Sequence, residues 1–121
     1  SKSLPKVFTD ASLLKLVIEN LIDNAIHYTR KGGEVSVNIE RKNGRNIIFK
    51  IKDDGIGISE EEKKYIFKKF FRAENALRKR TRGNGLGLYI CKSIIEKLGG
   101  KIWFDSKLNK GTTFYFTLPI K

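Results

Sequence analysis

The sequence predicts an α+β domain, a two-layer α/β sandwich in which helices cover one face of a mixed, mostly antiparallel sheet. Helical and strand patterns alternate along the chain, and two pairs of strands are each joined by a short turn. The 121 residues, of which 40% are hydrophobic, suffice for one packed domain and are too few for two. We therefore expect a single domain over residues 1–121. No apolar run approaches the roughly 18 residues of a membrane-spanning helix, so we expect no membrane contact by this domain.

The first predicted elements are a long helix and a strand. Thr9 or Asp10 can cap a helix that runs to about Tyr28, where Lys31–Gly33 ends it. Residues 34–41 are apolar at every second position, which is typical of a half-buried strand.

A hairpin and a short helix are predicted next. Asn43–Gly44 is a strong hairpin signal, and residues 47–53 form the returning strand. Ser59 and Glu62 have the spacing of a capping box, which predicts a short helix ending near Phe67.

The last predicted elements are a second amphipathic helix and a second hairpin. The helix covers residues 86–98 and ends at Gly99–Gly100. Residues 101–107 and 112–119 form the hairpin, across a turn at 109–111.

The net charge of +12 is concentrated in one segment. Residues 63–82 hold nine basic side chains and one acidic one, Glu74, and so supply +8 of the total. Such a strip indicates an anionic partner, which could be nucleic acid, a membrane surface, a polyphosphate or an acidic protein surface, or else it is a solvated surface. A single cysteine and a single histidine exclude an internal disulfide and the usual Cys/His zinc sites.

Two asparagines interrupt the apolar face of the first helix. Asn20 and Asn24 lie one turn apart within the apolar arc. Each amide could bond to a neighbouring backbone group, or the two amide oxygens could serve a hard cation such as Mg²⁺.

Two glycine-rich segments flank the basic strip. Asp53 ends a strand and is followed by Gly55 and Gly57, where its carboxylate could accept a hydrogen bond from an amino group, although Asp and Gly are also common in ordinary turns. Residues 83–88 open the second helix, where backbone N–H groups favour an anion. This segment lacks the P-loop pattern and does not follow a strand, which disfavours P-loop and Rossmann sites.

Read in order, these segments resemble the ATP-binding catalytic domain of two-component sensor histidine kinases. The resemblance covers nearly the whole chain and includes five motifs, which are residues 20–29, 53–57, 66–72, 83–88 and 111–114. That family belongs to the superfamily of gyrases, large heat-shock chaperones and mismatch-repair ATPases, so the resemblance implies a Bergerat-type ATP-binding fold.

The resemblance also implies roles for individual residues. Asn24 would coordinate a Mg²⁺ that bridges the ATP phosphates, assisted by Asn20. Asp53 would accept from the adenine amino group with support from Thr112, and Tyr28 would pack near the base. The other residues implied at the nucleotide are Gly55, Gly57, Ile58, Arg82, Gly83, Gly85, Leu86, Gly87 and Leu88.

Two further residues are assigned with alternatives. His27 stands where the family commonly has lysine, so it would either reach the phosphates or lie on the surface. Glu19 is the best candidate for a polarising carboxylate, although it falls on the charged arc. Residues 73–84 resemble the ATP lid of the family, and Phe67, Phe70 and Phe71 resemble an aromatic box that docks the lid or an adjacent helical domain, or they are core aromatics.

The implied function is a protein-histidine kinase that transfers the γ-phosphoryl group of Mg-ATP to a histidine of a separate dimerisation domain. We expect this chain to be the catalytic part of a longer kinase, a cytoplasmic part of a membrane-bound sensor, with a response regulator acting downstream and no nucleic acid as partner. The alternatives are an anti-sigma type serine kinase on the same fold, and a basic nucleic-acid-binding module that uses residues 63–82.

Overall fold

The computed structural model describes residues 11–29, 32–41, 44–68 and 87–119. Their elements follow in the order α1 (Ala11–Tyr28), β1 (Val35–Arg41), β2 (Asn46–Asp53), α2 (Glu60–Lys63), α4 (Gly87–Lys97), β3 (Ile102–Lys107) and β4 (Gly111–Pro119). The bounds of α1 and the strands agree with the expected ones to within one or two residues. The expected capping residues Thr9 and Asp10 lie outside the described residues.

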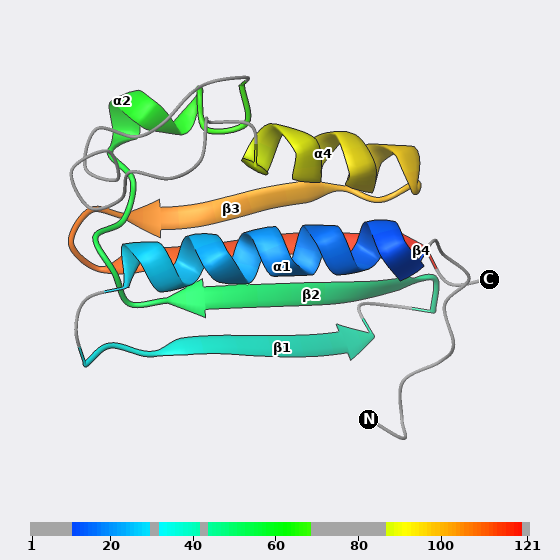
Figure 1. The fold of residues 1–121 in the computed structure, drawn as a ribbon, viewed down its shortest axis with the longest axis horizontal. Coiled ribbons are helices and arrows are strands. Elements are labelled where there is room, and N and C mark those ends of the chain that lie inside the picture. Colours follow the sequence, from blue (N-terminus) through cyan, green and yellow to red (C-terminus); the bar gives the residue numbers. More distant parts are fainter. Residues whose placement is uncertain (1–10, 30–31, 42–43, 69–86, 120–121) are drawn as a thin grey trace.

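The sheet has the strand order β1-β2-β4-β3, and all three strand pairs are antiparallel. Figure 1 shows α1 lying over the centre of the sheet and α4 over β3, so the helices cover one face only. The predicted two-layer sandwich is therefore confirmed. The expectation of a mixed sheet is not met among the described strands, since none of their pairings is parallel.

The core lies between the helices and the covered face of the sheet. Strand alternation directs Phe49, Phe114 and Phe116 to this face, where the rings of Phe49 and Phe116 stack with centroids 4.4 Å apart. From the helices, the fully buried Val17 and Leu21 of α1 and Cys91 and Ile95 of α4 pack against them. The opposite sheet face carries Trp103 and Tyr115, which stack on each other.

The short helix α2 differs from its predicted length. Ser59 caps it as expected, because its Oγ accepts from the backbone N–H of Glu62 and donates to the Glu62 carboxylate at 2.8 Å. After Lys63, however, hydrogen bonds from Tyr65 and Lys68 reach carbonyls three residues back, which is the tighter spacing of turns. The helix therefore ends at Lys63 and not near Phe67.

Because α4 is shorter than α1, one end of α1 has no α4 beside it. In Figure 1, α4 begins beside the middle of α1, so the C-terminal half of α1 extends past it over the ends of β2 and β4. No helix within the described ranges is both long and apolar enough to cross a bilayer.

Candidate functional site

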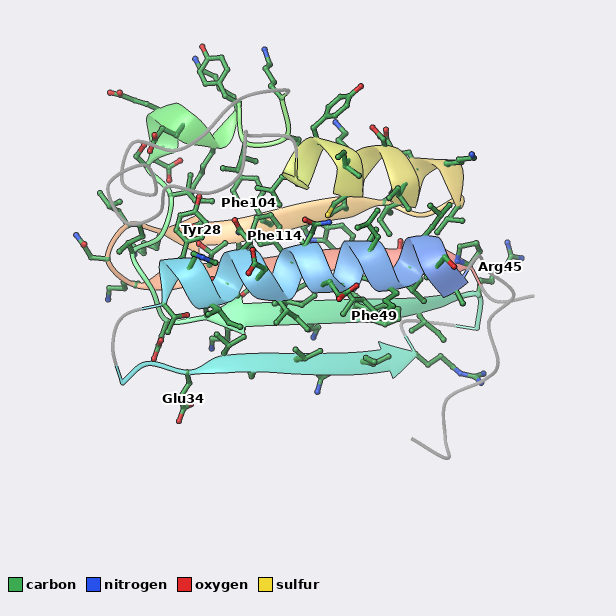
Figure 2. All side chains as sticks on the ribbon, viewed as in Figure 1. Tyr28, Glu34, Arg45, Phe49, Phe104 and Phe114 are labelled. Carbon is green, nitrogen blue, oxygen red and sulfur yellow. The ribbon has the colours of Figure 1, made fainter. Side chains whose placement is uncertain are left out.

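Buried polar side chains gather around the C-terminal half of α1 and the adjoining strand ends. Asp53 ends β2 and Thr112 lies directly opposite it on β4, both facing the helix layer, with exposed fractions of 2% and 4%. Asn24 of α1 is buried on the same helix face as Tyr28, one turn before it. Figure 2 shows the Tyr28 side chain at the end of α1, on the side of the helix that faces β3. The fold therefore brings together residues that are far apart in the sequence.

Asp53 is a hydrogen-bond acceptor in a nearly dry environment. Its Oδ1 accepts from the backbone N–H of Gly55 at 2.9 Å. Burial raises the pKa of its carboxyl above the usual value, although the backbone hydrogen bonds from Gly55 and Thr112 oppose this effect, and the nearby negative charge of Asp54 adds to it. A buried carboxylate of this kind gains from a ligand that offers a hydrogen-bond donor.

Two glycines let the backbone close around this carboxylate. A Cβ at Gly55 would overlap the carbonyl oxygen of Tyr28, and that same oxygen accepts from the backbone N–H of Ile56 at 3.2 Å. Gly57 has a φ of +73°, and a Cβ there would overlap the carbonyl oxygen of Lys107. The segment after β2 is therefore fixed by backbone contacts to α1 on one side and to β3 on the other. Ile58, which the sequence assigned to the site, is buried beside them.

Ser106 belongs to the site although sequence reasoning missed it. Its Oγ accepts from the backbone N–H of Ile58 at 2.7 Å, and lies 2.7 Å from the Thr112 hydroxyl. The detectable signal was the pairing register, since Ser106 lies opposite Thr112 on neighbouring strands. That register could not be read from either strand alone.

The two asparagines have different environments. Asn24 is 9% exposed, and its Nδ2 is the one buried side-chain nitrogen or oxygen among the described residues that has no hydrogen-bond partner. Asn20 is partly exposed, and its Nδ2 donates to the carbonyl oxygen of Leu16 at 2.9 Å. The expectation that both amides lie within the apolar face therefore holds for Asn24, whereas Asn20 lies at its edge.

The start of α4 lies close to Asn20. A Cβ built at Gly87 would approach the Asn20 Oδ1 to 3.3 Å, so the glycine leaves room beside this amide oxygen. Gly87 begins an 11-residue helix whose first backbone N–H groups have no partner within the helix. An anion held there would also benefit from the partial positive charge of the helix N-terminus.

The side chains at this site suit a metal cation whose coordination shell is completed by other ligands. Within the described part of the chain, no group of three or more His, Cys, Asp or Glu side chains could hold a metal ion by itself. The amide oxygens of Asn20 and Asn24 supply hard ligands, and Mg²⁺ commonly completes its shell with waters and substrate phosphates. The residues present therefore fit Mg²⁺ bound together with a polyphosphate.

His27 lies at the edge of the site and Glu19 lies outside it. The His27 Nδ1 is 2.8 Å from the carbonyl oxygen of Asp23 and 3.4 Å from the Asp23 carboxylate, and the side chain is only 22% exposed. Glu19 is exposed, and the helical repeat places it about 140° around α1 from Asn24. The structure does not bring Glu19 together with the buried polar groups.

Several assigned residues lie outside the described residues: Phe70, Phe71, Arg82, Gly83, Gly85 and Leu86. Leu88 is partly buried against the core. Phe67 makes edge-to-face contacts with Phe104 and Phe114, at centroid distances of 5.8 and 6.2 Å. Of the two expectations for Phe67, the structure supports the core aromatic.

Comparisons with known proteins give consistent matches. A sequence-family model described as histidine kinase-, DNA gyrase B- and HSP90-like ATPase matches residues 9–121. The adaptive-response sensory kinase SasA of Crocosphaera subtropica is 41% identical over 119 residues, which are 98% of this chain and 31% of that protein. The sensor protein SrrB of Staphylococcus aureus is 42% identical over 91% of this chain and 19% of its own length. The chain thus spans less than a third of these relatives.

Solved structures give the same result. The mycobacterial sensor histidine kinase MprB superposes with a TM-score of 0.86 at 32% identity, covering 95% of this chain and 77% of that one. The nucleotide-free catalytic domain of the histidine kinase ThkA superposes with a TM-score of 0.78 at 36% identity, covering 94% and 71%.

Proposed function

The chain belongs to the family of histidine kinase-, DNA gyrase B- and HSP90-like ATPases, as an ATP-binding domain of the histidine-kinase type, and from this we propose its function. It binds Mg-ATP at the site around Asn24 and Asp53, and transfers the γ-phosphoryl group to a histidine of a separate dimerisation domain. The observation that carries the proposal is the buried Asn24 Nδ2 without a partner. A folded protein leaves such a donor unsatisfied at a cost of about 1–3 kcal/mol, which a ligand that accepts from it would offset.

At the base end, Asp53 would select the nucleobase. Its carboxylate is an acceptor, so it favours a base edge with an exocyclic amino group, as in adenine. A 6-oxo group in the same pose would set two acceptors against each other in a buried site. Ile58 and Tyr28, both buried, supply apolar surface for the faces of the ring.

At the phosphate end, the chain supplies neutral oxygen ligands and hydrogen-bond donors. The amide oxygens of Asn24 and Asn20 would hold Mg²⁺, which when bound neutralises phosphate charge. The N-terminus of α4 begins beside the Asn20 amide oxygen, and the helical repeat places His27 about 20° around α1 from Asn20. A backbone carbonyl can only accept, so the His27 Nδ1 carries the proton in its contact with Asp23.

The transfer step asks the protein mainly to position the groups. The bond between the γ-phosphorus and its bridging oxygen breaks and ADP leaves with the electron pair, while a bond from an imidazole nitrogen to the phosphorus forms and the proton of that nitrogen passes to solvent water. His27 is the single histidine of the chain and is assigned to the edge of the proposed site, so we assign the acceptor histidine to another domain of the same kinase. With Glu19 exposed, we assign no general base within the described residues. The same proposal includes the later transfer of the phosphoryl group to a response regulator and a cytoplasmic location for this domain.

Calorimetric titration with Mg-ATP and Mg-GTP tests the binding part. We expect tight binding of Mg-ATP and not of Mg-GTP, and loss of this binding in Asp53→Asn. Asp54→Asn is the matched control and should retain binding, because the Asp54 carboxylate lies at the surface and accepts from the backbone N–H of Glu34. Equal affinities for the two nucleotides, or equal effects of the two substitutions, would contradict the assignment.

Incubation with γ-labelled ATP and the dimerisation domain of the same kinase tests the transfer part. We expect an acid-labile, base-stable label on that domain and none on this chain. Label on serine would favour the anti-sigma type of kinase instead.

A further inference from the structure

Ser106 makes three polar contacts with only one hydroxyl hydrogen. Its Oγ accepts from the backbone N–H of Ile58 at 2.7 Å, donates to the carbonyl oxygen of Gly111 at 3.1 Å, and lies 2.7 Å from the hydroxyl oxygen of Thr112. The Ile58 N–H can only donate and the Gly111 carbonyl can only accept. The direction of the remaining contact, with Thr112, is therefore determined by the other two.

The hydrogen count assigns the hydroxyl of Thr112. A serine hydroxyl has one hydrogen and two lone pairs. If its hydrogen goes to Gly111 and one lone pair accepts from Ile58, the other lone pair must accept from Thr112 for all three contacts to be hydrogen bonds. Thr112 then donates its own hydroxyl hydrogen to Ser106, so its Oγ1 can only accept a hydrogen bond from any further partner.

This assignment matters because Thr112 lies opposite Asp53. The two side chains face the same side of the sheet as a cross-strand pair, where Cβ atoms are about 5 Å apart. Asp53 as a carboxylate is also an acceptor. The Asp53 carboxylate and the Thr112 Oγ1 would then both act as acceptors toward the edge of a base.

We propose that Ser106 is a positioning residue that locks the Thr112 hydroxyl as an acceptor and so makes the site prefer 6-amino purines over 6-oxo purines. The inference rests on the proposed function, because it needs a nucleobase at Asp53. A threonine at 112 without this lock can rotate its hydrogen toward the ligand and donate to a 6-oxo group. The lock therefore contributes to selectivity beyond what the Asp53 carboxylate provides.

The test compares three ligands with Mg²⁺ by calorimetry: ATP, inosine triphosphate and inorganic tripolyphosphate. Inosine triphosphate carries a 6-oxo group, and tripolyphosphate has no base. In Ser106→Ala we expect the preference for ATP over inosine triphosphate to fall by about tenfold, while tripolyphosphate affinity stays unchanged. Ser106→Thr keeps the hydroxyl and should restore the preference. Ser93→Ala, which removes an exposed hydroxyl bonded to the Tyr89 carbonyl, is the matched control.

A double substitution separates the lock from a general packing effect. In a Thr112→Val background, Ser106→Ala should not change the ligand preference further, because the hydroxyl that it controls is gone. If Ser106→Ala weakens all three ligands equally, or leaves the preference unchanged while ATP still binds through Asp53, the inference is overturned and the proposed function stands. If the unsubstituted protein binds no ATP, the proposed function fails with it.

Discussion

Replacing Asn24 with leucine should stabilise the protein without nucleotide and abolish its response to Mg-ATP. The Nδ2 of Asn24 is buried without an acceptor, and a buried unsatisfied donor costs about 1–3 kcal/mol. Leucine has a similar size and adds apolar contact at a site that is 9% exposed. Allowing for imperfect packing of the new side chain, we expect the free energy of unfolding to rise by about 1–2 kcal/mol. For a domain of this size, each kcal/mol raises the Tm by about 3–6 °C.

The assay is urea or thermal unfolding of both proteins, with and without Mg-ATP. A ligand at 100 times its Kd stabilises a protein by about 2.7 kcal/mol, so the order of stabilities should reverse when Mg-ATP is added. Asn20→Leu is the control, because the Nδ2 of Asn20 already donates to Leu16 and its removal relieves nothing. A loss of more than about 1 kcal/mol in nucleotide-free Asn24→Leu, or an undiminished shift with Mg-ATP, would refute the reasoning.

Three other outcomes follow from the structure. Burial raises the pKa of Asp53 in the folded state above 3.8, the usual value for an unfolded chain. The free energy of unfolding should therefore fall as pH rises from 3.8 through the folded-state pKa, because the unfolded state ionises first. The stability of Asp53→Asn relative to the unsubstituted protein should therefore increase over that window and then level off, as urea titrations at several pH values would reveal. Gly55→Ala should destabilise by more than about 2 kcal/mol, because its Cβ overlaps the Tyr28 carbonyl, whereas Gly44→Ala, with nothing within 4 Å of its Cβ, should change stability by less than about 1 kcal/mol in thermal melts. Burial raises the pKa of the Cys91 thiol to about 12, so iodoacetamide at pH 8 should label it only as fast as the protein unfolds; rapid labelling of folded protein would show that α4 opens locally.

The elements themselves could be predicted because local periodicity determines them. Alternating apolar residues placed β1 and the Asn43–Gly44 hairpin signal placed β2, each to within one residue, and the Ser59–Glu62 spacing placed the start of α2. The end of α2 could not be predicted, because the composition of residues 64–67 is compatible with a helix and only the observed i to i−3 hydrogen bonds distinguish it from turns.

The site required information that no single segment contains. A helical wheel gives Asn20 and Asn24 similar positions, but their burial differs because Asn20 lies at the edge of the buried face of α1, beside the start of α4. Ser106 was missed because its role depends on a register between β3 and β4 and on the approach of Ile58 from a third segment. Motif spacing located Asp53 and Thr112, whereas the hydrogen bonds that orient them depend on tertiary contacts.

The pairing of β2 with β4 bears on how the chain folds. The β1–β2 and β3–β4 hairpins each close a short turn, while β2 and β4 are separated by both α2 and α4. Contacts between distant segments form more slowly than local ones and require more chain entropy to be lost. Asp53 and Thr112 face each other across this long-range pairing. The two residues that we propose for the base therefore come together only when the two hairpins dock, and a bound nucleotide should slow the separation of the two halves of the sheet rather than the fraying of either hairpin.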